Sequence, residues 1–249
     1  MCTHFYPPVL PRPRLTGYCA PVDEGQLTIA LRIAKVRTQI AAACERTLRP
    51  ISSVQLLAVS KTKSEAAIRE AYAAGQRDFG ENYVQEMVAK AAALADLPDL
   101  RLHLIGPLQR NKVKQVLPIA ALIHTVDRET LADEIQKRAE ALGRVVPVLI
   151  EVNVGGELSK AGCTPDDAER LADHVRACKN LSLRGLMTIP PDTDDRDRTR
   201  GYFAALRDLR DKIGNLPDLS MGMSHDFEIA IEEGATIVRV GTAIFGSRS

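Results

Sequence analysis

The sequence predicts an α/β fold, a single (β/α)8 barrel with a leading helix. Short runs of leucine and β-branched residues alternate along the chain with longer segments of helical periodicity, a pattern typical of a parallel α/β protein. Eight such runs occur within about 200 residues, and glycines and polar residues gather directly after them, as expected at the carboxyl ends of barrel strands. An open doubly wound sheet is the alternative architecture.

The chain begins with a proline-rich segment, and a helical pattern follows it. Five of the 14 prolines fall within residues 1–21, a density that prevents a regular helix, so we expect residues 1–22 to be a disordered extension. Apolar residues then recur at intervals of three and four from Asp23 to Arg46, which predicts an amphipathic helix. Residues 23–249 are expected to form the barrel domain.

The remaining elements follow in alternation. We expect strands near residues 55–60, 77–80, 101–105, 121–125, 146–153, 181–187, 219–222 and 236–240. We expect helices at residues 64–75, 82–95, 110–117, 128–142, 165–178, 196–213 and 225–233. Because barrel active sites gather at the carboxyl ends of the strands, a functional site is expected in the loops that follow these eight strands.

Composition and charge exclude several classes of partner. The formal net charge is +1, and the charged residues, 26% of the chain, are interspersed, so we expect neither nucleic acid nor an acidic membrane as a partner. No apolar run approaches the roughly 20 residues of a membrane span, and the amino terminus lacks the order of a signal peptide. The five scattered cysteines indicate neither a metal site nor a disulfide framework, and a cytoplasmic location is expected.

Lys61 is the strongest candidate for chemistry. It directly follows the first predicted strand, and a helical pattern begins immediately after it. A lysine in a partly apolar barrel mouth loses its proton more readily than a solvated one, and it can attack an aldehyde to form a Schiff base. From this segment alone, a solvated loop lysine is the alternative.

The loops after the seventh and eighth strands contain residues suited to an anion. Ser224 is placed to cap a helix that begins near His225, while Gly241 and Thr242 follow the last strand. A phosphate between these two loops is the position that barrels use most often. The alternatives are that Ser224 is only a helix cap and that Gly241 is only a turn residue.

Other polar residues need partners. Arg239 in the last strand should point into the barrel mouth, where it could donate to a pyridine nitrogen, or outward, where it could pair with a glutamate of residues 228–233. Asn82 could cap the second barrel helix or bind a ligand. His103 and His124 lie on apolar strands and are expected to be satisfied core histidines, not metal ligands.

Six segments together resemble one known family. They are AVSKT (58–62), FGENYVQE (79–86), HLIGPLQRNK (103–112), RGLM (184–187), MGMS (221–224) and VRVGTAIFG (238–246). These motifs resemble the pyridoxal phosphate homeostasis proteins, also called the YggS-like or proline synthetase co-transcribed family. The likeness runs from about residue 24 to the end of the chain.

The resemblance implies a barrel of the alanine racemase N-terminal-domain type that holds pyridoxal 5'-phosphate (PLP) as an internal aldimine. It also implies seven cofactor-binding residues, which are the aldimine-forming Lys61, the phosphate-binding Ser224, Gly241 and Thr242, Arg239 beside the pyridine nitrogen, and Asn82 and Met223 beside the ring.

The resemblance favours a carrier over an enzyme. A racemase needs acid and base groups on both faces of the substrate carbon, and in the fold-related racemases one is a tyrosine of a second domain, for which this chain leaves no room. The expected function is therefore PLP homeostasis without turnover, by a monomer that holds PLP and hands it to apo-enzymes or limits the free aldehyde. A PLP-dependent amino-acid racemase and a cofactor-free Schiff-base lyase are the alternatives.

Overall fold

The computed structural model describes residues 27–157 and 160–246, which form a closed barrel of eight parallel strands. Consecutive strands are neighbours, and the last strand pairs with the first. The strands are β1 (Gln55–Val59), β2 (Asp78–Glu81), β3 (Arg101–Leu104), β4 (Ala120–Val126), β5 (Val146–Glu151), β6 (Leu181–Met187), β7 (Asp218–Ser220) and β8 (Ile237–Val240). The predicted barrel is confirmed, and the open sheet is wrong. Residues 1–22, expected to be disordered, lie outside the described residues.

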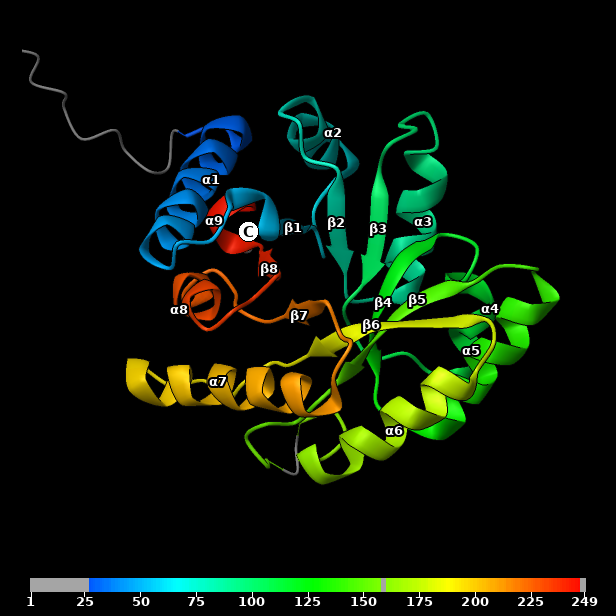
Figure 1. Cartoon of the computed structure of the whole chain (residues 1–249). Helices are drawn as coiled ribbons and strands as arrows, with labels where there is room; N and C mark the ends of the chain where they lie inside the picture. Colours follow the sequence, from blue (N-terminus) through cyan, green and yellow to red (C-terminus); the bar gives the residue numbers. More distant parts are fainter. Residues whose placement is uncertain (1–26, 158–159, 247–249) are drawn as a thin grey trace, which may run out of the picture.

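Helices surround the barrel (Figure 1). They are α1 (Ile29–Arg46), α2 (Glu65–Ala73), α3 (Val84–Ala93), α4 (Val113–Val116), α5 (Glu129–Ala141), α6 (Pro165–Ala177), α7 (Arg196–Ile213), α8 (Phe227–Glu232) and α9 (Thr242–Phe245), with the 3-10 turns η2 (Ile51–Ser53) and η3 (Arg110–Lys112). The helix expected at 110–117 is divided into η3 and α4, and α9 has no counterpart among the expected helices, because four residues are too few for a periodic pattern. Among the described helices, none is long and apolar enough to cross a membrane.

The leading helix α1 completes the outer layer of helices between α8 and α2 (Figure 1). α1 contacts α2, α8 and α9, and it begins at Ile29 because the Thr28 side chain accepts a hydrogen bond from the Leu31 N–H. Its buried stripe includes Ile33 and Val36. Burial of each such side chain stabilises the fold by about 1.5–3 kcal/mol relative to leaving it exposed.

The barrel interior holds both apolar and polar side chains. Alternate residues of each strand point inward, and an inner apolar core results from Leu57, Ile105, Leu122, Leu149, Met187 and Ile237. The interior polar side chains include His103, His124 and Arg239, and each of these residues is at most 4% exposed. Bulky aliphatic residues normally dominate this position, so the polar set requires an explanation.

Candidate functional site

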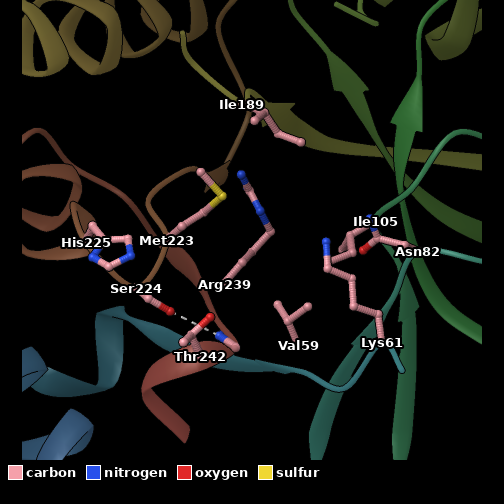
Figure 2. Close-up of a pocket in the computed structure, with 11 residues that line it drawn as sticks. Val59, Lys61, Asn82, Ile105, Ile189, Met223, Ser224, His225, Arg239 and Thr242 are labelled. Atoms are coloured by element: carbon pink, nitrogen blue, oxygen red, sulfur yellow. Dashed lines mark hydrogen bonds between the residues drawn. The ribbon is translucent and has the colours of Figure 1, made fainter. Parts of the chain in front are cut away.

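A cavity of about 260 Å³ opens at the carboxyl ends of the strands and gathers all seven residues singled out from the sequence. Its lining consists of Val59, Lys61, Asn82, Ile105, Ile189, Met223, Ser224, His225, Arg239, Gly241 and Thr242. Figure 2 shows these side chains converging on one space from several strands and loops. Val59, Ile105 and Ile189 are apolar lining residues that the sequence did not single out, because apolar residues at strand ends look like core residues in a sequence.

Lys61 lies in the turn directly after β1, and its side chain extends into the cavity (Figure 2). The next residue, Thr62, has a φ of 61°, which is a costly conformation for a β-branched residue. The Thr62 N–H donates a hydrogen bond to the Glu86 carboxylate at 2.5 Å. This contact fixes the backbone on the carboxyl side of Lys61.

A buried charged cluster fixes the backbone on the other side of Lys61. Lys90 Nζ donates to the Ser60 carbonyl at 2.6 Å and to Glu81 Oε1 at 2.8 Å. It also donates to Glu86 at 2.6 Å, and the Ser60 hydroxyl donates to Glu81 at 2.6 Å. Burial raises the pKa of Glu81, although its bonds to Lys90 and Ser60 oppose that shift. The sequence analysis missed this cluster; the position of Lys90 on the buried stripe of α3 is the signal that could have found it.

Arg239 points into the barrel and forms part of the cavity floor (Figure 2). Its guanidinium donates to Ser220 Oγ and to the Thr188 carbonyl, both at 2.8 Å. Burial lowers the pKa of Arg239 to about 10, although the charges of Asp226 and Glu151 oppose the shift. The guanidinium therefore remains a cation at neutral pH.

The alternative pairing expected for Arg239 is wrong. The glutamates of residues 228–233 bind Arg46 and Arg200 instead. Arg239 is only 3% exposed and its hydrogen-bond partners lie inside the barrel. The inward choice follows from strand alternation, which places Arg239 on the same face as Ile237 of the inner core.

Glu151 is a second buried ionisable group near Arg239. It ends β5 and is 6% exposed. Burial raises the pKa of Glu151 to about 7, with the Asp127 carboxylate adding to the shift and Arg239 opposing it. A carboxyl group at the carboxyl end of the barrel therefore changes its charge near neutral pH.

Ser224 connects the two loops that were expected to bind an anion. Its Oγ accepts hydrogen bonds from the N–H groups of Gly241 at 3.3 Å and Ala243 at 3.5 Å. The expectation that Ser224 caps a helix beginning near His225 is wrong, because the chain forms a turn there and α8 begins at Phe227. Ser224 instead binds the first turn of α9, which brings the loops after β7 and β8 together (Figure 2).

Asn82 has a side-chain oxygen without a partner in the described structure. Its Oδ1 is buried and accepts no hydrogen bond, which is costly unless a ligand or water supplies a donor. The expected alternative of a helix cap is wrong, since α3 has no side-chain cap. The Asn82 backbone is fixed, because a Cβ at Gly106 would lie 2.2 Å from the Asn82 carbonyl oxygen. Asn82 is therefore held at the cavity, and its Oδ1 atom can accept a hydrogen bond from a ligand.

The chain matches the family described as alanine racemase, N-terminal domain, over residues 32–249. It is 50% identical over 222 residues to the pyridoxal phosphate homeostasis protein of Aquifex aeolicus, an alignment that covers 87% of this chain and 97% of that protein. It is likewise 50% identical over 222 residues to the protein of the same name from Pseudomonas aeruginosa, covering 89% of this chain and 96% of that protein.

A solved structure gives the same result. PipY of Synechococcus elongatus, whose structure was determined with PLP bound, has a TM-score of 0.78 and 42% sequence identity. The alignment covers 88% of this chain and 100% of that chain. These similarities confirm the resemblance that the sequence motifs indicate.

Proposed function

Because the chain belongs to the family of pyridoxal phosphate homeostasis proteins and matches the alanine racemase N-terminal domain, we propose that it binds PLP in the Lys61 cavity. The observation that carries the proposal is the convergence of Lys61, Arg239 and Ser224 on one cavity. Each supplies what one part of PLP requires, which is an amine for the aldehyde, a donor for the pyridine nitrogen and a hydroxyl for the phosphate.

The phosphate would be held by Ser224, Gly241 and Thr242. The Ser224 hydroxyl can donate to a phosphate oxygen, and backbone N–H groups at the start of α9 lie beside it. A Cβ at Gly241 would lie 3.3 Å from both Val59 Cβ and the Val59 carbonyl oxygen. A larger residue at Gly241 would therefore crowd this end of the cavity.

The pyridine ring would be held by Arg239, Asn82 and Met223. The Asn82 Oδ1 atom is buried without a partner and would gain one from the ligand. Arg239 can only donate, so it suits an unprotonated pyridine nitrogen. An unprotonated ring is a weaker electron sink, and this favours a carrier over an enzyme that stabilises carbanions.

Lys61 would hold the cofactor covalently. When bound, PLP supplies an aldehyde whose carbon the Lys61 amine attacks, so that the C=N bond of an internal aldimine forms and one water leaves. We infer that the protein holds and releases PLP in the cytoplasm, as a monomer and without turnover of its own. Apo forms of PLP-dependent enzymes would be its recipients.

One observation favours a second candidate function, an amino-acid racemase. His225 lines the cavity together with Lys61, so the site contains a second group able to transfer a proton. A racemase would interconvert D- and L-amino acids and would lose that activity in His225→Ala. A carrier would show no such turnover in the wild type.

The test is PLP loading of the wild type, Lys61→Ala and the control Lys114→Ala, whose lysine is exposed on α4. We expect the wild type and Lys114→Ala to turn yellow and to carry the label on Lys61 after borohydride reduction and peptide mapping. Lys61→Ala should stay colourless. A wild type that remains colourless in excess PLP, or a label on another lysine, would contradict the proposal. Loaded wild type incubated with D- and L-amino acids should leave them unchanged.

A further inference from the structure

A chain of hydrogen bonds crosses the barrel interior beneath the cavity. Arg239 donates to Ser220 Oγ at 2.8 Å, and Ser220 Oγ lies 3.0 Å from His124 Nδ1. His124 Nε2 lies 3.1 Å from His103 Nδ1. His103 Nε2 in turn lies 3.2 Å from Asp78 Oδ1. Both histidines are satisfied core residues, as expected from the sequence, and they satisfy each other.

The chain connects the two ends of the barrel. Arg239 lines the Lys61 cavity, whereas Asp78, the first residue of β2, lines a second cavity of about 320 Å³ at the amino ends of the strands. All five residues of the chain are at most 6% exposed. A buried polar network of this length is costly unless every member is satisfied, and aliphatic residues would fill the same space at less cost.

The two ends of the chain determine its direction. Arg239 has donors only. Burial would raise the pKa of Asp78, but hydrogen bonds from His103 and Arg101 outweigh this effect and hold the pKa well below its usual range. Asp78 is therefore an ionised acceptor, and when both rings between it and Arg239 are neutral, every link passes from donor to acceptor in the same direction.

Charge balance then assigns the ring protons. Arg101 binds both carboxylate oxygens of Asp78, at 2.6 and 2.7 Å, so a proton on His103 would add a buried cation to a carboxylate that is already paired. Burial and the positive charge of Arg239 hold the pKa of His124 well below its usual value. With both rings neutral, each histidine donates from Nε2 and accepts at Nδ1, and the Ser220 hydroxyl donates to His124.

We propose that Asp78, His103, His124 and Ser220 are positioning residues that form a one-way relay and hold Arg239 as a fixed donor at the cavity floor. The consequence for PLP rests on the proposed function. A guanidinium held at Ser220 cannot turn away from the pyridine nitrogen, so the ring remains unprotonated. The relay thereby extends the control of the cofactor to residues that line the opposite end of the barrel.

The first experiment reads the relay in the protein without PLP. Nitrogen-15 NMR of labelled histidine rings distinguishes the two neutral tautomers and the cation. The protein has five histidines, so the variants His103→Gln and His124→Gln are needed to assign the signals of these two rings. We expect both rings in the form that the hydrogen-bond chain requires, which is neutral with the proton on Nε2. A proton on His124 Nδ1, or a doubly protonated His103, would overturn the relay.

The second experiment breaks the link between Arg239 and His124. Ser220→Ala removes the hydroxyl, and Ser220→Thr retains it as the matched control. We expect Ser220→Ala to broaden the Arg239 side-chain N–H signals and to move the pH midpoint of the bound PLP absorption band by about one unit, the order of effect of one hydrogen bond to a charged group. A purely structural serine would affect stability without moving the midpoint.

A break at the far end provides an independent check. Asp78→Asn introduces a side chain that can donate as well as accept, so the direction of the relay is no longer imposed. We expect it to shift the PLP midpoint in the same sense as Ser220→Ala. If the wild type binds PLP and neither variant moves its midpoint, the positioning role fails while the proposed function stands. If the wild type does not bind PLP, the proposed function fails, and the histidine and Arg239 signals still decide whether the relay exists.

Discussion

Replacing Lys90 with methionine tests whether the buried cluster beside Lys61 stabilises the fold. Methionine keeps an unbranched apolar side chain but removes the ammonium group that contacts the Ser60 carbonyl and two carboxylates. Glu81 is fully buried, and its Oε2 atom has no hydrogen-bond partner among the described residues. In the variant, the Ser60 hydroxyl would still donate to that carboxylate.

The magnitude is limited by proton uptake. Removing one partner of a buried ion pair costs about 3–5 kcal/mol when the other charge must remain. Glu81, whose pKa burial already raises, can instead become protonated, which costs about 1.4 kcal/mol for each pH unit above its unfolded pKa of about 4.3, or about 3.7 kcal/mol at pH 7. The loss should therefore be about 3.7 kcal/mol at pH 7 and about 1 kcal/mol at pH 5, because protonation is easier there.

The assay is urea unfolding followed by circular dichroism, because the chain contains no tryptophan. Lys114→Met, on an exposed position of α4, is the control and should change stability by less than about 0.5 kcal/mol. Glu81→Gln added to Lys90→Met should recover part of the loss, since it removes the buried charge. A loss below about 1 kcal/mol that is equal at both pH values would refute the reasoning.

Three further predictions concern Glu151, Thr62 and Gly106. Since burial raises the pKa of Glu151 to about 7, the wild type should lose up to about 3 kcal/mol as pH rises from about 4 to about 7, and urea unfolding of Glu151→Gln should remove this slope. Thr62→Gly should relieve the positive φ and stabilise the fold by about 1 kcal/mol in urea unfolding, while the looser Lys61 turn weakens PLP binding in an absorbance titration. Gly106→Ala should lower the thermal midpoint and PLP affinity, because its Cβ would meet the Asn82 backbone; an unchanged midpoint would contradict this contact.

The sequence predicted the helices and strands that have a clear apolar periodicity, and it missed α9, which is too short to show one. The strand expected at 181–187 and the helix expected at 196–213 have the same bounds in the structure, because their apolar periodicity and flanking polar residues are local. Ser224 lines the cavity together with the other candidate residues, but the helix cap that the sequence suggested for it is wrong. Its position next to a helical pattern resembled a cap for α8, whereas it binds α9, which is too short to be recognised.

The relay could not be predicted for a different physical reason. His124 and Ser220 are separated by 96 residues and meet only because the barrel closes. A histidine between apolar neighbours has the same local pattern whether it donates to a single carbonyl or belongs to a chain, so the sequence supported only the statement that its nitrogens are satisfied. The hydrogen-bond chain has a direction because Arg239 at one end can only donate and the ionised Asp78 at the other end can only accept. A sequence signal for such a relay is therefore an inward-facing arginine on one strand and an inward-facing carboxylate on another, with amphoteric side chains at inward positions between them.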